Sequence, residues 1–368
     1  MHVHVLDPSA YTPPYDHALC HALGQAGADV DLFTSHFSYG QVAQPDSYTR
    51  HEFFYRRSHR WTARQRRSRA GMATKLIEHV PDMLRYRRSA QGAGIVHFQW
   101  LTVQPIDIWL LPKDRPLVLT AHDVLPREPR PGQLAAQRKL YERMDAIVVH
   151  SQHGHERLVG HLGCEQDRVH VIPHGVLRPW EGHAEQPLPA QLREADGPVV
   201  LFFGLLRPYK GLDVLLEAWR GIEDAELWIV GMPRMDTSQL RATAPLNVRF
   251  IESYIPDGQI PAFMDRASFV VLPYLEIDQS GALFTALGRG TPVLLSDAGG
   301  FPELADTGAA RIVPRGDSAA LHDALRNLLD DEAALTKMCV KARVASEEAY
   351  SWQAIAQAHI ELYERLLR

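Results

Sequence analysis

The sequence predicts an α/β protein with two doubly wound, parallel-sheet domains that face a central cleft. The chain has 368 residues, which suits two domains at about 150 residues each. Short apolar runs alternate with helical segments in both halves, the pattern of parallel sheets. Residues 177–197 separate the halves, and this stretch is polar and rich in proline, without apolar periodicity.

In the first half, apolar runs predict six buried strands, and residues 16–26 have the three-and-four spacing of a helix. The predicted strands are 2–6, 30–33, 95–98, 117–121, 146–150 and 169–172. We therefore expect a first domain over residues 1–177.

The second half repeats the pattern, which predicts a second domain over residues 178–350. Its predicted strands are 198–204, 226–230, 248–251, 268–273, 292–295 and 310–313, and its last helices are 318–329, 331–346 and 352–367. Ligands of doubly wound domains bind beyond the carboxyl ends of the strands, so the loops at those ends are the first place to search.

The composition excludes several classes of protein. There are 39 Lys and Arg against 44 Asp and Glu, a formal net charge of −5, which argues against nucleic acid as a partner. Hydrophobic residues make up 45% and charged residues 23%, as in soluble globular proteins. No apolar run approaches the 18 or so residues of a membrane span, and the three cysteines lack metal-ligand spacing. We expect a cytoplasmic protein with reduced thiols.

The loop after the first strand of the second domain carries two cations. Gly204 ends the strand, Arg207 and Lys210 follow, and a helix starts after Gly211. A glycine lets a ligand approach the backbone, and two cations three residues apart can reach the same phosphate group. The loop is therefore a candidate diphosphate clamp, and the alternative is a surface loop with two solvated cations.

A second polar loop follows the strand 268–273. It contains Glu276 and Asp278, and Ser280 and Gly281 then open a helix whose free N–H groups favour an anion. Alternatively, Ser280 is only a helix cap and the acids are solvated.

Several segments together resemble the family-four glycosyltransferases of GT-B fold, which have two Rossmann-like domains. The resemblance covers nearly the whole chain and rests on G-x-x-R-x-x-K-G at 204–211, on ALGRGTPVLLSDAGGFPEL at 286–304 and on RVHVIPHGV at 168–176. IVHFQW at 95–100, VLTAHDVLP at 118–126 and MDAIVVHSQHGHERL at 144–158 are also similar to family segments. It implies retaining transfer of a hexose-like sugar from a nucleoside diphosphate sugar to a hydroxyl acceptor, without a metal or other cofactor. It also implies that a last helix, 351–368, crosses back to the acceptor-binding first domain, and that the second domain binds the donor.

The resemblance also assigns individual residues. Arg207 and Lys210 match the family pair on the donor diphosphate, and His122 matches a histidine beside the reacting sugar. The donor-binding residues are then Gly204, Glu276, Asp278, Ser280, Gly281, Thr285 and, at the nucleobase, Tyr254. The acceptor-side residues are Tyr11, Asp16, His97, Trp100 and Arg127. No residue is placed as a covalent nucleophile, so front-side attack is expected.

The chain departs from the family pattern at two places. Many members have two glutamates with seven residues between them, and the corresponding positions here are Ile277 and Thr285. Glu276 or Asp278 could substitute for the first glutamate, but the second has only a threonine hydroxyl. Pro13 and Pro14 stand where the family usually has a glycine pair near the diphosphate, a contact that Tyr11 or Thr12 could replace.

The segment Arg56–Arg69 holds seven arginines and no acid. It could contact an anionic membrane surface, on the inner face of the membrane, or receive a phosphorylated or lipid-linked acceptor. The alternative is a solvated arginine-rich loop.

Two other functions stay open at the level of sequence. The first is a sugar-nucleotide epimerase or a phosphorylase of similar fold. The second is a non-catalytic nucleotide-sugar-binding homologue, which the loss of the second glutamate keeps open.

Overall fold

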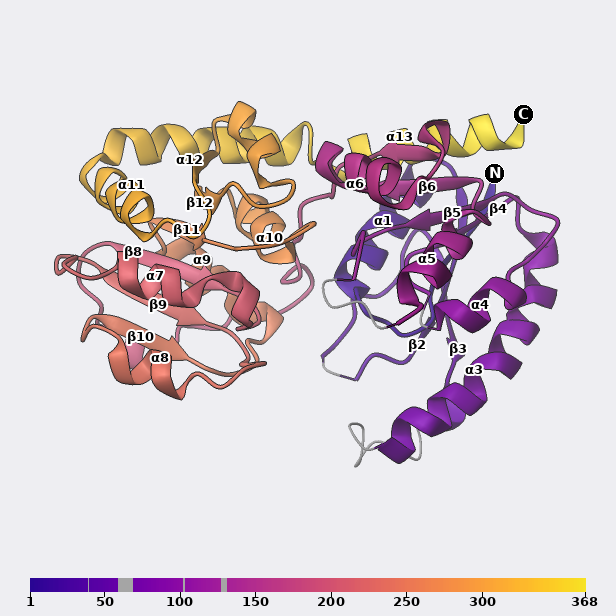
Figure 1. The fold of residues 1–368 in the computed structure, drawn as a ribbon, viewed down its shortest axis with the longest axis horizontal. Helices are drawn as coiled ribbons and strands as arrows, with labels where there is room; N and C mark the ends of the chain where they lie inside the picture. Colours follow the sequence, from indigo (N-terminus) through magenta and orange to yellow (C-terminus); the bar gives the residue numbers. More distant parts are fainter. Residues whose placement is uncertain (39, 59–68, 102, 127–130) are drawn as a thin grey trace. The chain divides into compact units, whose positions relative to one another are not determined.

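The computed structural model describes residues 1–38, 40–58, 69–101, 103–126 and 131–368. These residues form two compact units (Figure 1). Unit 1 comprises Met1–Pro173 together with Trp352–Arg368, and unit 2 comprises His174–Ser351. Each unit contains one parallel β-sheet with helices packed against it, which confirms the predicted fold class.

Unit 1 contains a seven-stranded sheet in the order β3-β2-β1-β4-β5-β6-β7, with every neighbouring pair parallel. The inner strands β4, β5 and β6 are buried along their whole length, which explains their unbroken apolar sequences. The strands are β1 (His2–Asp7), β2 (Asp29–Ser35), β3 (Thr49–Phe54), β4 (Ile95–Phe98), β5 (Leu117–Thr120), β6 (Ala146–Val149) and β7 (Val169–Val171).

The helices of unit 1 cover this sheet, and the last helix of the chain is among them. α13 (Trp352–Leu367) packs against α1 (Pro13–Gln25), with the rings of Trp352 and Tyr15 5.1 Å apart. The remaining helices are α3 (Arg69–Ser89), α4 (Gln104–Leu110), α5 (Gln133–Tyr141) and α6 (Gln152–Leu162), with 3-10 turns at Ala90–Gly92 and Gln166–Arg168.

Unit 2 contains a six-stranded sheet in the order β10-β9-β8-β11-β12-β13, again with parallel neighbours throughout. Its strands are β8 (Val199–Phe203), β9 (Glu226–Val230), β10 (Val248–Ile251), β11 (Phe269–Leu272), β12 (Val293–Ser296) and β13 (Ala310–Val313). The order reverses between β8 and β11, and such a switch point is where doubly wound domains bind ligands.

The helices of unit 2 bury apolar faces against this sheet in one continuous core. They are α7 (Leu212–Ala218), α8 (Ser238–Thr243), α9 (Ile260–Arg266), α10 (Gly281–Arg289), α11 (Ser318–Asp330) and α12 (Glu332–Glu347). Short 3-10 turns lie at Ala190–Leu192, Pro208–Lys210, Asp257–Gln259 and Phe301–Thr307.

Candidate functional site

In unit 2 the two predicted donor loops lie against each other at the switch point. The loop after β8 and the loop after β11 are joined by a hydrogen bond from the Leu275 N–H to the Tyr209 carbonyl, 2.8 Å long. Gly211 has a φ of +67°, and a Cβ there would lie 2.1 Å from the Pro273 carbonyl oxygen. Only glycine fits this contact, so Gly211 fixes the spacing of the two loops.

Gly204 lies between the Lys210 amine and the start of α10. Its φ is +117°, and a Cβ there would lie 3.1 Å from Lys210 Nζ and 3.6 Å from the Ala282 Cβ. The Lys210 side chain is buried, and its Nζ lies 4.7 Å from the centre of the Tyr274 ring. The absence of a side chain at 204 therefore lets the Lys210 amine lie close to the first turn of α10.

The first turn of α10 adds hydrogen-bond donors beside the Lys210 amine. Ser280 is the residue before the helix, and its carbonyl accepts from the N–H groups of Leu283 and Phe284. The N–H groups of Gly281 and Ala282 have no carbonyl of their own helix to bond, and they carry the positive end of the helix dipole. The Ser280 hydroxyl is buried and points at the Tyr274 hydroxyl, 3.5 Å away.

Arg207 is exposed on the same loop as Lys210. Among the residues that the structure describes, none forms an ion pair with its guanidinium. Lys210 is thus the inner cation of the loop and Arg207 the outer one. Together with α10, they can bind an anion with two charged groups.

The remaining residues predicted to bind the donor differ in accessibility. Glu276 is exposed and Asp278 is buried. Thr285 is buried, and its hydroxyl donates to the Gly281 carbonyl over 2.8 Å, so its single proton is already used inside α10. Tyr254 lies in the loop after β10, two strands from β8, and the residue is 45% exposed. The donor contacts of all four residues stay predictions.

In unit 1 the residues that follow β1, β4, β5 and β6 gather around His122. The His122 ring is stacked on Trp100, with ring centres 5.0 Å apart and planes at 14°. The ring of Tyr15 meets it edge-on at 4.8 Å. Tyr11 lies 5.2 Å from Trp100, centre to centre. His122 therefore has a fixed ring plane at the carboxyl edge of the sheet.

Hydrogen bonds also hold both ring nitrogens of His122. His150 is fully enclosed, and burial lowers its pKa to about 4, so its ring is neutral at pH 7. Its Nδ1–H donates to the Ile172 carbonyl over 3.0 Å, which leaves Nε2 as an acceptor. The His122 Nδ1 lies 3.3 Å from that atom and donates to it. The His122 Nε2 lies 3.0 Å from the Gln99 side-chain oxygen, so both ring nitrogens of His122 have a partner.

This arrangement continues through Gln99 to the C-terminal helix. The Gln99 amide donates to His97 Nε2 over 3.3 Å, and the other nitrogen of His97 lies 2.6 Å from the Tyr363 hydroxyl on α13. Burial holds the pKa of His97 well below its usual value, so this ring is also neutral. We call the series Tyr363, His97, Gln99, His122 and His150 the histidine chain.

Asp7 organises the loop that replaces the glycine pair. Its carboxylate accepts from the backbone N–H groups of Ser9, Tyr11 and Thr12 at 3.2, 2.5 and 3.1 Å. Thr12 precedes α1, and its hydroxyl accepts from the Trp100 indole N–H at 3.0 Å. The prolines at 13 and 14 fit because they occupy the first positions of α1, where no N–H is needed.

Two residues predicted for the acceptor side are enclosed in unit 1. Asp16 is 1% exposed and bonds to Asp7, and burial together with that charge raises its pKa well above the usual value, so Asp16 carries a proton. His97 is 0% exposed within the histidine chain. A direct acceptor contact, predicted for both residues, does not fit this burial. Tyr11 and Trp100 remain accessible, and Arg127 lies outside the described residues.

Sequence reasoning missed Asp7, Gln99 and His150. Asp7 directly follows the predicted strand 2–6, Gln99 directly follows 95–98, and His150 is the last residue of 146–150. Polar residues at such positions meet at one edge of a parallel sheet, and this rule would have found them.

Comparison with known proteins identifies the class. Residues 15–176 match the family described as Glycosyltransferase Family 4, and residues 197–331 match the family described as Glycosyl transferases group 1. The D-inositol 3-phosphate glycosyltransferase of Nocardia farcinica is 27% identical over 94% of this chain and 82% of its own length. The phosphatidyl-myo-inositol mannosyltransferase of Mycobacterium leprae is 36% identical over 46% of each chain.

A solved structure agrees with the fold. Anabaena HepE, determined in complex with UDP, superposes over 100% of both chains with a TM-score of 0.74 at 18% identity. The protein therefore belongs to the group 1, family 4 glycosyltransferases of GT-B fold. It is a retaining glycosyltransferase that takes a sugar from a nucleotide sugar.

Proposed function

We propose that unit 2 binds the nucleoside diphosphate of the donor through Lys210, Arg207 and the first turn of α10. The observation that carries this proposal is the close approach at Gly204, where the Lys210 amine lies on one side of the glycine and the start of α10 on the other. A diphosphate is the part of a nucleotide sugar that needs this combination of cations and N–H donors. The same groups stabilise the charge that develops on the leaving diphosphate.

We infer that His122 binds the sugar that is transferred. Its ring is held in place by the stacked Trp100 and by its hydrogen bond to His150, so it can meet the sugar in one orientation. The acceptor hydroxyl then attacks from the side of the departing phosphate, which takes its proton. No covalent intermediate with the protein is required in this scheme.

Transfer is proposed to need no divalent metal, because cationic side chains and a helix start supply the positive charge at the diphosphate. Lys210 and Arg207 contribute formal charges there, and α10 contributes the partial charge of its dipole. This arrangement is expected of an enzyme that does not bind the donor diphosphate through Mg²⁺.

The acceptor is proposed to be a hydroxyl of a glycan, a lipid-linked sugar or a small molecule that unit 1 binds near Tyr11 and Trp100. Two relatives act on phosphorylated or lipid-linked inositol, by their names. Among the described residues, no helix is long and apolar enough to cross a membrane. We propose a cytoplasmic enzyme that makes peripheral contact with anionic lipid through Arg56–Arg69. Most of that segment lies outside the described residues.

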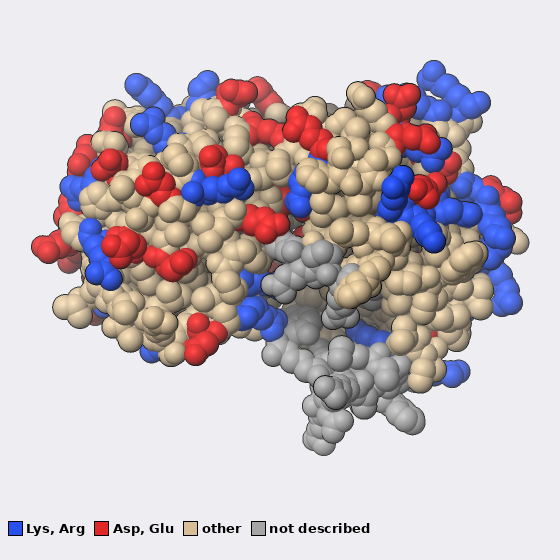
Figure 2. All heavy atoms as spheres, in the orientation of Figure 1, with Lys and Arg blue, Asp and Glu red and all other residues tan. Residues whose placement is uncertain are grey.

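The distribution of charge argues against nucleic acid as a binding partner. Basic and acidic side chains are interspersed on the face that Figure 2 shows, and the net charge is −5. A polyanion-binding protein would present a continuous basic surface.

The test is a panel of UDP, GDP, ADP and dTDP sugars, with binding measured by calorimetry and turnover by release of the nucleoside diphosphate. We expect the nucleotide sugars of one base to bind most tightly. Without an acceptor, these donors should release their nucleoside diphosphate only slowly. Binding of a nucleotide sugar without turnover by any acceptor would favour the non-catalytic homologue. Interconversion of the donor sugar without acceptor would favour an epimerase.

A further inference from the structure

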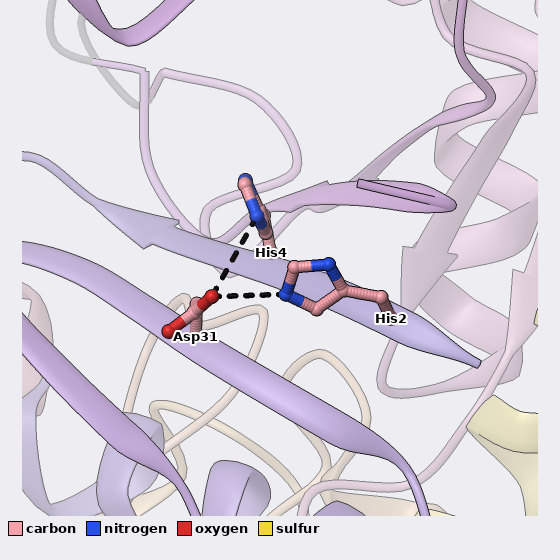
Figure 3. Close-up of side chains that lie close together, drawn as sticks. All are labelled: His2, His4 and Asp31. Carbon is pink, nitrogen blue, oxygen red and sulfur yellow. Dashed lines mark hydrogen bonds and ion pairs between the residues drawn. The ribbon is translucent and has the colours of Figure 1, made fainter. Parts of the chain in front are cut away.

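A group of metal-ligating side chains lies near the amino ends of the unit 1 strands. His2 and His4 are two residues apart on β1 and project from the same face, and Asp31 on β2 pairs with His4 in the sheet register (Figure 3). His2 Nε2 lies 2.9 Å from Asp31 Oδ2, and His4 Nε2 lies 3.8 Å from the same oxygen. The donor atoms of the three residues all lie within 4.8 Å of one another.

Each of the three side chains already has the outer contact that orients a ligand. The far nitrogen of His2 donates to the Gly92 carbonyl over 3.0 Å, and that of His4 lies 3.2 Å from the Tyr86 hydroxyl. The second oxygen of Asp31 accepts from His51 Nε2 over 2.7 Å. Such contacts turn the Nε2 atoms of ligating histidines toward a metal ion and fix the carboxylate beside them.

The charges of the group favour a cation in its centre. With its Nδ1–H given to Gly92, a neutral His2 has only a lone pair at Nε2, and that lone pair faces the Asp31 carboxylate. Two acceptors at 2.9 Å repel, so either a proton or a metal ion must lie between them.

We propose that His2, His4 and Asp31 bind one divalent transition-metal ion of the Zn²⁺ class, with a water as fourth ligand. Two imidazoles and one carboxylate suit such an ion and not Ca²⁺ or Mg²⁺, which prefer oxygen ligands. Bonds of about 2.0–2.1 Å place neighbouring ligand atoms about 3.3 Å apart in a tetrahedral site. The observed 2.9 and 3.8 Å lie on either side of that value.

The site is separate from the chemistry proposed for the transfer reaction. His4 precedes Asp7 by three residues on β1, which is about 10 Å along a strand. The ion would connect β1 and β2, with outer contacts to the end of α3 through Tyr86 and to the turn at Gly92. Metal binding should therefore raise the stability of unit 1 and leave sugar transfer unchanged.

The test uses the untagged full chain, stripped with a chelator, dialysed and titrated with ZnCl₂ by calorimetry. We expect one Zn²⁺ per chain and a rise in the thermal unfolding temperature. His2→Ala and Asp31→Asn should each weaken binding by at least about tenfold. His2 is partly exposed, so its removal is compatible with folding, which circular dichroism checks.

His21→Ala is the matched control, because His21 also pairs with an aspartate of unit 1, Asp46, at 2.6 Å. It should bind Zn²⁺ like the wild type. Absorption by bound Co²⁺ should show a four-coordinate site in the wild type and the control only. The proposal fails if His2→Ala binds Zn²⁺ as tightly as the wild type, or if His21→Ala loses as much affinity.

Discussion

Adding one methyl group at Gly204 should separate the stability of unit 2 from its activity. Gly204→Ala forces a residue with a Cβ into a φ of +117°, which costs about 1–3 kcal/mol. For a unit of this size, that lowers the unfolding temperature by roughly 2–4 °C per kcal/mol. The new Cβ also lies 3.1 Å from Lys210 Nζ, so the amine must shift by a few tenths of an ångström from the position in which we propose that it binds the diphosphate.

Gly221→Ala is the control, because Gly221 has a φ of +82° but no heavy atom lies within 4 Å of a Cβ added there. Both variants should lose comparable stability in thermal unfolding. Only Gly204→Ala should lose turnover. The loss should reach up to two or three decades, which corresponds to the about 2–4 kcal/mol of transition-state stabilisation that one such group contributes. Normal kcat/KM in a folded Gly204→Ala, or an equal loss in Gly221→Ala, would refute this reasoning.

Four further predictions concern the clamp, the metal, the histidines and the arginine segment. Arg207→Ala and Lys210→Ala should each lower kcat/KM by about two to three decades, and a folded double variant with near-normal turnover would rule out the clamp. EDTA should leave the transfer rate unchanged, and a loss restored by Mn²⁺ or Mg²⁺ would contradict metal-independent transfer. Unit 1 should lose stability as the pH falls from 6.5 toward 4, because buried His150 has a pKa of about 4 and the unfolded chain binds more protons in this window; an unfolding temperature unchanged between pH 7.5 and 4.5 would argue against it. The protein should sediment with anionic but not zwitterionic vesicles at low salt, and changing the arginines at 64, 66, 67 and 69 to Gln should abolish this while a soluble acceptor still turns over. Loss of that turnover would assign the arginines to the acceptor site.

Much of the fold could be predicted because buried parallel strands have unbroken apolar sequences. The strands β8 to β13 each match a predicted run to within one or two residues. β3 was missed because its sequence, TRHEFF, lies at the sheet edge and is only partly buried. An edge strand can bury too little to require an apolar sequence, and pattern reasoning then does not detect it.

Sequence alone located the loops of the candidate site but not the contacts within them. The spacing of Gly204, Arg207 and Lys210 indicated a clamp, whereas the close approach of Gly204 to α10 depends on how two separate loops pack. The hydrogen bond between His97 and Tyr363 was also beyond prediction, because Tyr363 lies at the far end of the chain. The metal-ligating group had a weak signal, two histidines two apart on a predicted strand, but Asp31 joins them only through the sheet register.

The most direct test of the central claim is calorimetric binding of nucleoside mono- and diphosphates to the wild type and to Lys210→Met. The methionine keeps the packing of the lysine stem near Phe202 and Tyr274 and removes only the charge. Lys337→Met, on α12, controls for the loss of a lysine elsewhere in unit 2. The account predicts that the wild type and the control bind the diphosphate of the preferred base at least about tenfold more tightly than its monophosphate, and that Lys210→Met loses this difference. Equal affinity for the two nucleotides in the wild type, or an undiminished preference in Lys210→Met, would contradict it.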